Sequence, residues 1–256
     1  MVARGSNRVV LLETEEAEMT LVEHLEELRR RLFVCLAAVS AGTAIAFFLR
    51  EAILRALLRP LPIEANALVG HDGRPLIAVT GIGEGFSVLL KLSIAAGIAL
   101  ASPVWVHQLW SFTRPALNGR EKKYALPATF VGIGLFISGL TVGFVALRYP
   151  LNWLLSFDDG LFVQVITADN YFTFVAYFLL GFGITFELPL VLTSLALLGF
   201  VSSNTLKAHR AKALVGLWLT SCVVTPGADP YSPAIVGVAF TVLYFVSEAL
   251  IRLLGR

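Results

Sequence analysis

Residues 171–199 have the sequence YFTFVAYFLLGFGITFELPLVLTSLALLG, in which Glu187 is the only charged residue. A helix needs about 20 mostly apolar residues to cross the roughly 30 Å hydrocarbon core of a bilayer, because each residue adds about 1.5 Å of length. This segment exceeds that requirement. It therefore predicts a transmembrane helix and places the chain among integral membrane proteins.

The composition of the whole chain agrees with this assignment. Of its 256 residues 57% are hydrophobic and 15% are charged, whereas soluble domains average about 45–50% apolar and about 25% charged residues. The chain is too hydrophobic for intrinsic disorder, and its net charge of +2 is too small to suggest nucleic-acid binding. The sequence has no metal-ligand spacing and no phosphate-binding loop, so we expect neither a metal nor another cofactor.

Five further apolar segments predict membrane spans, at residues 32–49, 86–110, 124–148, 213–224 and 234–250. The segment 213–224 is short, about 18 Å as a helix, and Pro226 and Gly227 prevent its extension at one end. We therefore predict an all-α membrane protein with six transmembrane helices, the last two short. This single domain covers residues 20–252, between an acidic, disordered tail at 1–19 and a short tail at 253–256.

Lysine and arginine residues are unevenly distributed between the two sets of connections. One set contains residues 29–31, 120–123 and 207–212, which are rich in these residues, and the other set has few of them. Cytoplasmic loops of membrane proteins carry such an excess. The pattern predicts that both termini are cytoplasmic, which agrees with an even number of spans.

Glu187 lies near the middle of its predicted span, where a charged side chain costs about 3 kcal/mol or more and is by default a candidate functional residue. Pro189 cannot supply the backbone donor that the carbonyl of Thr185 would use, so we expect the helix to bend there. One hypothesis is a proton-coupled small-solute transporter in which Glu187 carries the proton. Such transporters often contain internal repeats, of which this sequence shows none. A purely structural Glu187 is a second alternative.

Two carboxylates lie near the predicted cytoplasmic face. Residues 20–31 form an amphipathic pattern that begins with a capping box at Thr20, and we expect a helix at the membrane surface. Within it Glu27 and Arg31 are four residues apart, a spacing typical of an ion pair within one helix. Glu121 is the only acid in a basic loop. It either neutralises its neighbours or forms part of a site for a cationic ligand.

Four motifs together resemble the TatC family, the core subunit of the twin-arginine protein translocase. The sequence HLEELRRRL at residues 24–32 is similar to the HLxELRxRL signature that opens TatC proteins. Three more motifs follow in the family's order: FTRPALNGRE at 112–121, FGITFELP at 182–189 and TPGAD at 225–229. The resemblance extends from about residue 20 to residue 252.

The resemblance implies a receptor rather than an enzyme. TatC proteins of the bacterial cytoplasmic membrane bind the paired arginines in the signal peptides of folded cargo proteins. Carried over by position, Glu27 and Glu121 would engage these arginines, because guanidinium groups bind carboxylates with two parallel hydrogen bonds. The residues that would shape this site are Arg29, Phe112, Pro115 and Leu117.

The resemblance also implies further positions. Glu187, with Pro189, would face a water-accessible cavity of a concave, cup-like bundle, and Pro60 matches a family proline in the first periplasmic loop. The last two spans would bind single-span TatA and TatB partners and support export driven by the proton-motive force; self-association is also expected. Their candidate docking residues are Thr225, Asp229 and Ser232, although Pro233 stands where many members carry a polar residue.

Overall fold

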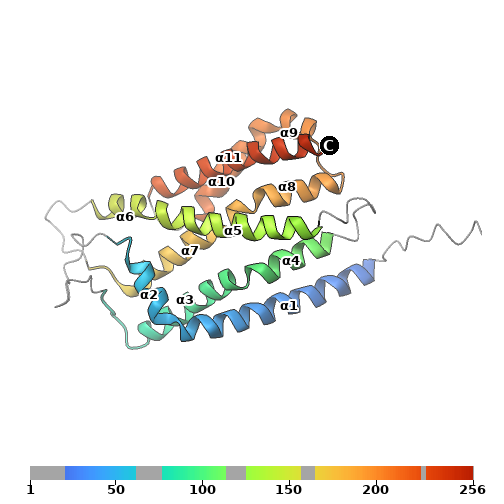
Figure 1. The fold of residues 1–256 in the computed structure, drawn as a ribbon. Helices are drawn as coiled ribbons and strands as arrows, with labels where there is room; N and C mark the ends of the chain where they lie inside the picture. The colour runs from blue at the N-terminus through green and yellow to red at the C-terminus, as the bar shows by residue number, and fades with distance from the viewer. Residues whose placement is uncertain (1–20, 62–76, 114–124, 157–164, 226–228, 256) are drawn as a thin grey trace, which may run out of the picture.

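The computed structural model describes residues 21–61, 77–113, 125–156, 165–225 and 229–255 of the chain (Figure 1). Within these ranges the regular structure is helical, apart from one isolated bridge between Ala78 and Thr167. The predicted all-α class is therefore confirmed. The predicted tail at 1–19 lies outside the described residues.

Eleven helices follow one another in the described part of the chain. They are α1 (Leu21–Phe48), α2 (Arg50–Leu58), α3 (Glu84–Leu100), α4 (Ser102–Thr113), α5 (Ala125–Ala146), α6 (Arg148–Leu155), α7 (Ala168–Phe186), α8 (Leu188–Leu197), α9 (Ser203–Ala208), α10 (Arg210–Val224) and α11 (Tyr231–Leu253).

Several of these helices are long and apolar enough to cross a membrane. Four segments meet that requirement by length and composition: Leu25–Phe48, Pro127–Leu155, Ala168–Leu197 and Tyr231–Leu253. A fifth would be the bent pair Glu84–Leu100 and Ser102–Phe112, whose axes differ by 53°. The remaining predicted span falls on α10, which has only 15 residues, in agreement with the short helix expected there. The last span, predicted to be short at residues 234–250, is not short. Helix α11 continues beyond both of these bounds to 23 residues and meets the length requirement.

The long helices lie side by side, with α1 beginning and α11 ending at the same end of the bundle (Figure 1). Helix α7 contacts both α3 and α5, while α11 contacts α8 and α10. Helices α1 and α3 approach closely at two glycines, because a Cβ atom on Gly42 would lie 2.7 Å from the carbonyl oxygen of Gly97. Small residues at such contacts are typical of helices that associate within membranes.

An apolar groove of about 350 Å³ lies between α3 and α5, with α7 between them. Helix α2 covers its outer part, and the Tyr171 hydroxyl holds α2 in place by donating a hydrogen bond to the carbonyl oxygen of Leu57 at 2.7 Å. Pro60 follows directly after α2, where a proline ends a helix without loss of an internal hydrogen bond. The groove lies among four helices, and the concave, cup-like shape of the whole bundle stays a prediction.

Candidate functional site

The candidate carboxylate Glu27 is held in a three-residue cluster between α1 and α4. The Arg31 Nε atom donates a hydrogen bond to Glu27 Oε1 at 3.0 Å, and Nη2 of the same guanidinium donates to the same oxygen. Arg31 Nη1 donates to Gln108 Oε1 on α4 at 3.0 Å. The ion pair predicted from the four-residue spacing is therefore present, and Gln108 extends it to a second helix.

The second carboxylate oxygen of Glu27, Oε2, lacks the hydrogen bonds that Oε1 accepts. Oε2 is buried and accepts no hydrogen bond from any residue that the structure describes. The side chains of Glu27 and Arg31 are only 11% and 16% exposed, so water solvates this pair poorly. A buried acceptor without a donor is costly, which makes Oε2 a candidate contact for a bound ligand.

Two of the other predicted site residues, Phe112 and Arg29, lie on the helices that carry this cluster. Phe112 is half-buried and lies four residues after Gln108, hence on the same face of α4. Arg29 is exposed, with its guanidinium carbon 5.8 Å from the centre of the Phe33 ring. The remaining members of the predicted site, Pro115, Leu117 and Glu121, lie outside the described residues, as does Thr20 of the capping box.

The two residues Glu27 and Arg31 of the cluster lie on one continuous helix. We expected residues 20–31 to form a separate helix along the membrane surface, but α1 runs from Leu21 to Phe48 without interruption. The sequence contains no glycine or proline between Glu27 and Leu32 that would end a helix. The hydrogen bond from Arg31 to Gln108 also fixes this part of α1 against α4.

Glu187 lies at the junction of α7 and α8, where the helix is interrupted. Its backbone N–H bonds the carbonyl oxygen of Ile184 rather than that of Gly183, so the regular helical pattern is lost at this point. Pro189 occupies the first turn of α8, where a missing backbone N–H is tolerated. The helix is therefore interrupted at the position that Pro189 led us to expect.

The surroundings of Glu187 differ from the water-accessible cavity expected from the family resemblance. Glu187 is 4% exposed, and neither carboxylate oxygen has a hydrogen-bond partner among the described residues. A Cβ atom built on Gly132 of α5 would lie 3.4 Å from Glu187 Oε2 and 2.7 Å from Val106 of α4. The carboxylate of Glu187 therefore lies close to Gly132 of α5, where the close approach of Val106 of α4 leaves no room for a larger residue.

The turn before α11 contains the three predicted docking residues, all of them buried. Asp229 accepts hydrogen bonds from the backbone N–H of Ser232 at 2.6 Å and from its hydroxyl at 2.8 Å. The Thr225 hydroxyl donates to the carbonyl oxygen of Ser221 at 2.7 Å. These polar groups therefore satisfy the ends of α10 and α11, a capping role that sequence analysis did not anticipate.

An ion pair links α10 to α11 near their predicted cytoplasmic ends. Arg210 Nη2 donates to both carboxylate oxygens of Glu248, at 2.9 and 2.8 Å. A pair within α11 between Glu248 and Arg252, four residues apart, would also be compatible with helical spacing. Glu248 is buried on the face of α11 that packs against α10, whereas Arg252 is exposed, so only Arg210 reaches it.

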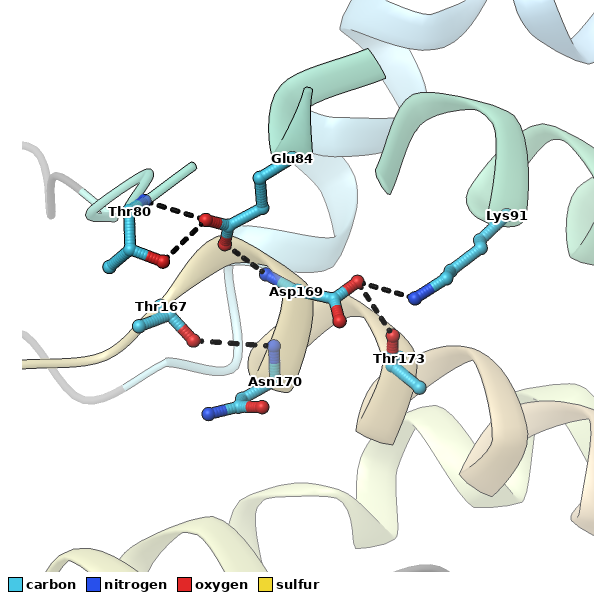
Figure 2. A network of polar contacts seen from close by, with 7 residues as sticks. All are labelled: Thr80, Glu84, Lys91, Thr167, Asp169, Asn170 and Thr173. Atoms are coloured by element: carbon cyan, nitrogen blue, oxygen red, sulfur yellow. Dashed lines mark hydrogen bonds and ion pairs between the residues drawn. The ribbon is translucent and has the colours of Figure 1, made fainter. Parts of the chain in front are cut away.

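A polar network at the opposite end of the bundle joins α3 to α7 (Figure 2). Glu84 Oε2 accepts hydrogen bonds from the Thr80 hydroxyl and from the backbone N–H groups of Thr80 and Gly81, and Oε1 accepts from the N–H of Asp169 at 3.1 Å. Lys91 Nζ lies 2.7 Å from Asp169 Oδ1 and completes the network. The contact with Asp169, which is 85 residues away in the chain, has no counterpart in the local sequence pattern.

Comparisons with known proteins match this fold over nearly its whole length. Residues 23–252 match the family model described as Sec-independent protein translocase protein (TatC). The TatC protein of Carboxydothermus hydrogenoformans is 35% identical over 91% of this chain and 93% of its own length. That of Frankia casuarinae is 34% identical over 91% of this chain, which spans about two thirds (65%) of the Frankia protein.

Solved structures give the same result. A crystal structure described as the twin arginine translocase receptor TatC superimposes with a TM-score of 0.76 at 30% sequence identity, covering 91% of this chain and 100% of the other. A second structure of that receptor in the detergent DDM has a TM-score of 0.77 at 29% identity. The chain therefore belongs to the TatC family, whose members are non-enzymatic membrane components of the Sec-independent protein translocase.

Proposed function

We propose that this chain is the receptor of a twin-arginine translocase and binds the paired arginines of signal peptides on folded cargo proteins at the cytoplasmic face. Glu27 and Glu121 supply the carboxylates. The observation that carries the proposal is the buried Oε2 atom of Glu27, which has no donor among the described residues although Oε1 of the same carboxylate already binds the guanidinium of Arg31. The solved structures that resemble this chain are themselves described as receptors.

The chemistry of the site suits a guanidinium ligand. A guanidinium group offers five N–H donors in a planar fork, whereas an ammonium group offers three around a point charge. The half-buried environment of Glu27 reduces screening by water and strengthens such a hydrogen bond. Arg29, Phe112, Pro115 and Leu117 border the bound segment, with Phe112 presented from the same face of α4 as Gln108.

Helix α10 provides the docking surface for single-span TatA and TatB partners. Val215, Leu219 and Val223 follow each other at four-residue intervals and are 60%, 64% and 85% exposed, so they form one apolar stripe. Such a stripe suits packing against a transmembrane helix. Thr225, Asp229 and Ser232 contribute by fixing the turn beside this surface.

The chain spans the bacterial cytoplasmic membrane six times with both termini in the cytoplasm. The start of α1 and the end of α11 lie at the same end of the bundle (Figure 1), and basic residues are concentrated in the connections assigned to that side. In this orientation Pro60 lies on the periplasmic side. Self-association and coupling to the proton-motive force belong to the same proposal.

The proposal is tested by photo-crosslinking a precursor with a twin-arginine signal peptide to the full chain in membrane vesicles. We expect Glu27→Gln and Glu121→Gln each to reduce the crosslinked product strongly, because the amide keeps the shape of the side chain but not its charge. Glu26→Gln is the matched control, since Glu26 is the exposed neighbour of Glu27 on α1. Full crosslinking to both site variants, with normal membrane insertion, would refute the proposal.

A further inference from the structure

We propose that Arg31 occupies Glu27 as an internal substitute for a signal-peptide arginine, and that cargo binds by displacing Arg31 from Glu27 while Arg31 keeps its bond to Gln108. The inference rests on the proposed function, because it assumes that Glu27 receives a cargo arginine. It adds a residue that determines specificity for this site.

The carboxylate of Glu27 already binds a guanidinium group, that of Arg31. Two nitrogen atoms of the Arg31 guanidinium contact the single oxygen Oε1 of Glu27, and the side chains are 16% and 11% exposed. The guanidinium thus already forms the type of contact that a cargo arginine would form. Oε2 is buried and without a donor among the described residues, so an incoming guanidinium gains access to both oxygens only if the local contacts rearrange.

Gln108 gives the displaced guanidinium an alternative partner. The Oε1 atom of Gln108 accepts a hydrogen bond from Arg31 Nη1 at 3.0 Å, whereas Nε and Nη2 of Arg31 donate to Glu27. The two sets of donors are separate, so Arg31 can leave Glu27 and remain bonded to α4. Since a partly buried guanidinium without any acceptor is costly, Gln108 lowers the free energy required for the exchange.

The exchange explains how the site can select arginine over lysine. A competing ligand must replace two N–H contacts on Glu27, which a second guanidinium fork can do. An ammonium group has a compact geometry, is more strongly hydrated and is a weaker competitor. Arg31 therefore competes with the cargo for Glu27, and a cargo arginine displaces it whereas a cargo lysine does not.

A merely structural Arg31 would behave differently. If it only oriented Glu27 or joined α1 to α4, its removal would weaken the binding of arginine and lysine signals alike. If it competes with cargo, its removal strengthens binding and helps the lysine signal more. The two roles thus predict changes of opposite sign.

The test measures the affinity of the full chain, in lipid nanodiscs, for fluorescent signal peptides that contain either the arginine pair or a lysine pair. For Arg31→Gln we expect the arginine-to-lysine affinity ratio to fall by about threefold to tenfold, the effect of removing one half-buried charged competitor. Arg31→Lys should give an intermediate ratio. Gln108→Leu should weaken binding of the arginine peptide, because the displaced guanidinium loses its acceptor.

Arg30→Gln is the matched control, because it removes the same charge from an exposed neighbouring position and should leave the ratio unchanged. An unchanged or increased ratio in Arg31→Gln and Arg31→Lys, with both variants folded by thermal unfolding, would overturn the inference. Glu27→Gln is measured alongside. Normal binding of the arginine peptide to that variant would refute the proposed function, whereas its loss together with an unchanged ratio in the Arg31 variants would refute the exchange alone.

Discussion

The ion pair between Arg210 and Glu248 predicts an unequal response to removal of its two members. The side chain of Glu248 is only 10% exposed to solvent, whereas that of Arg210 is 41% exposed. In Arg210→Gln the carboxylate stays buried without its two charged hydrogen bonds, and removal of one member of a buried pair costs about 3 kcal/mol or more. In Glu248→Gln the guanidinium can turn toward water and still lies over the Phe245 ring, at 5.1 Å, so we expect a loss of only about 1 kcal/mol.

The assay is the free energy of unfolding of the purified full chain in mixed micelles, titrated with a denaturing detergent. The double variant Arg210→Gln with Glu248→Gln should be more stable than Arg210→Gln alone, because no buried charge remains. A loss in Glu248→Gln equal to or greater than that in Arg210→Gln would refute the argument that burial of the carboxylate dominates. Arg252→Gln is the control, since Arg252 is exposed on α11 and should have little effect.

Two other predictions concern stability. Glu84→Gln should lower the thermal stability, because its amide nitrogen cannot accept the hydrogen bonds that one carboxylate oxygen of Glu84 accepts. Unchanged thermal stability would contradict a structural role for this network. Gly42→Leu should destabilise the contact between α1 and α3 by about 2 kcal/mol or more, because even its Cβ atom would lie 2.7 Å from the carbonyl oxygen of Gly97. Gly134→Leu, whose Cβ has nothing within 4 Å, is the matched control, and equal thermal stability of the two variants would rule out the close approach.

Local features of the fold could be predicted from the sequence because their causes are local. The lengths of the apolar segments predicted a membrane protein. Pro189 predicted the interruption of the helix beside Glu187, since a missing backbone donor acts within one turn. The pair of Glu27 and Arg31 followed from helical spacing alone. The short α10 followed from the residues that limit it.

Contacts between distant parts of the chain could not be predicted in this way. Gln108 is 77 residues from Arg31, and Asp169 is 85 residues from Glu84, so no periodicity connects them. Arg210 is 38 residues from its partner Glu248, and the packing of α11 against α10 brings the two together. Glu187 likewise lies beside Gly132, which is 55 residues away on a neighbouring helix.

The proposed role of Glu27 is tested most directly by a double-mutant cycle between this residue and the signal-peptide arginines. Affinities are measured in nanodiscs for the wild-type chain and Glu27→Gln, each with the arginine-pair peptide and with peptides in which one arginine is replaced by glutamine. The account predicts a coupling energy of about 1.5 kcal/mol or more with one of the arginines, as found for close charge pairs across interfaces. Additive losses, within about 0.5 kcal/mol for both arginines, would contradict direct contact with Glu27.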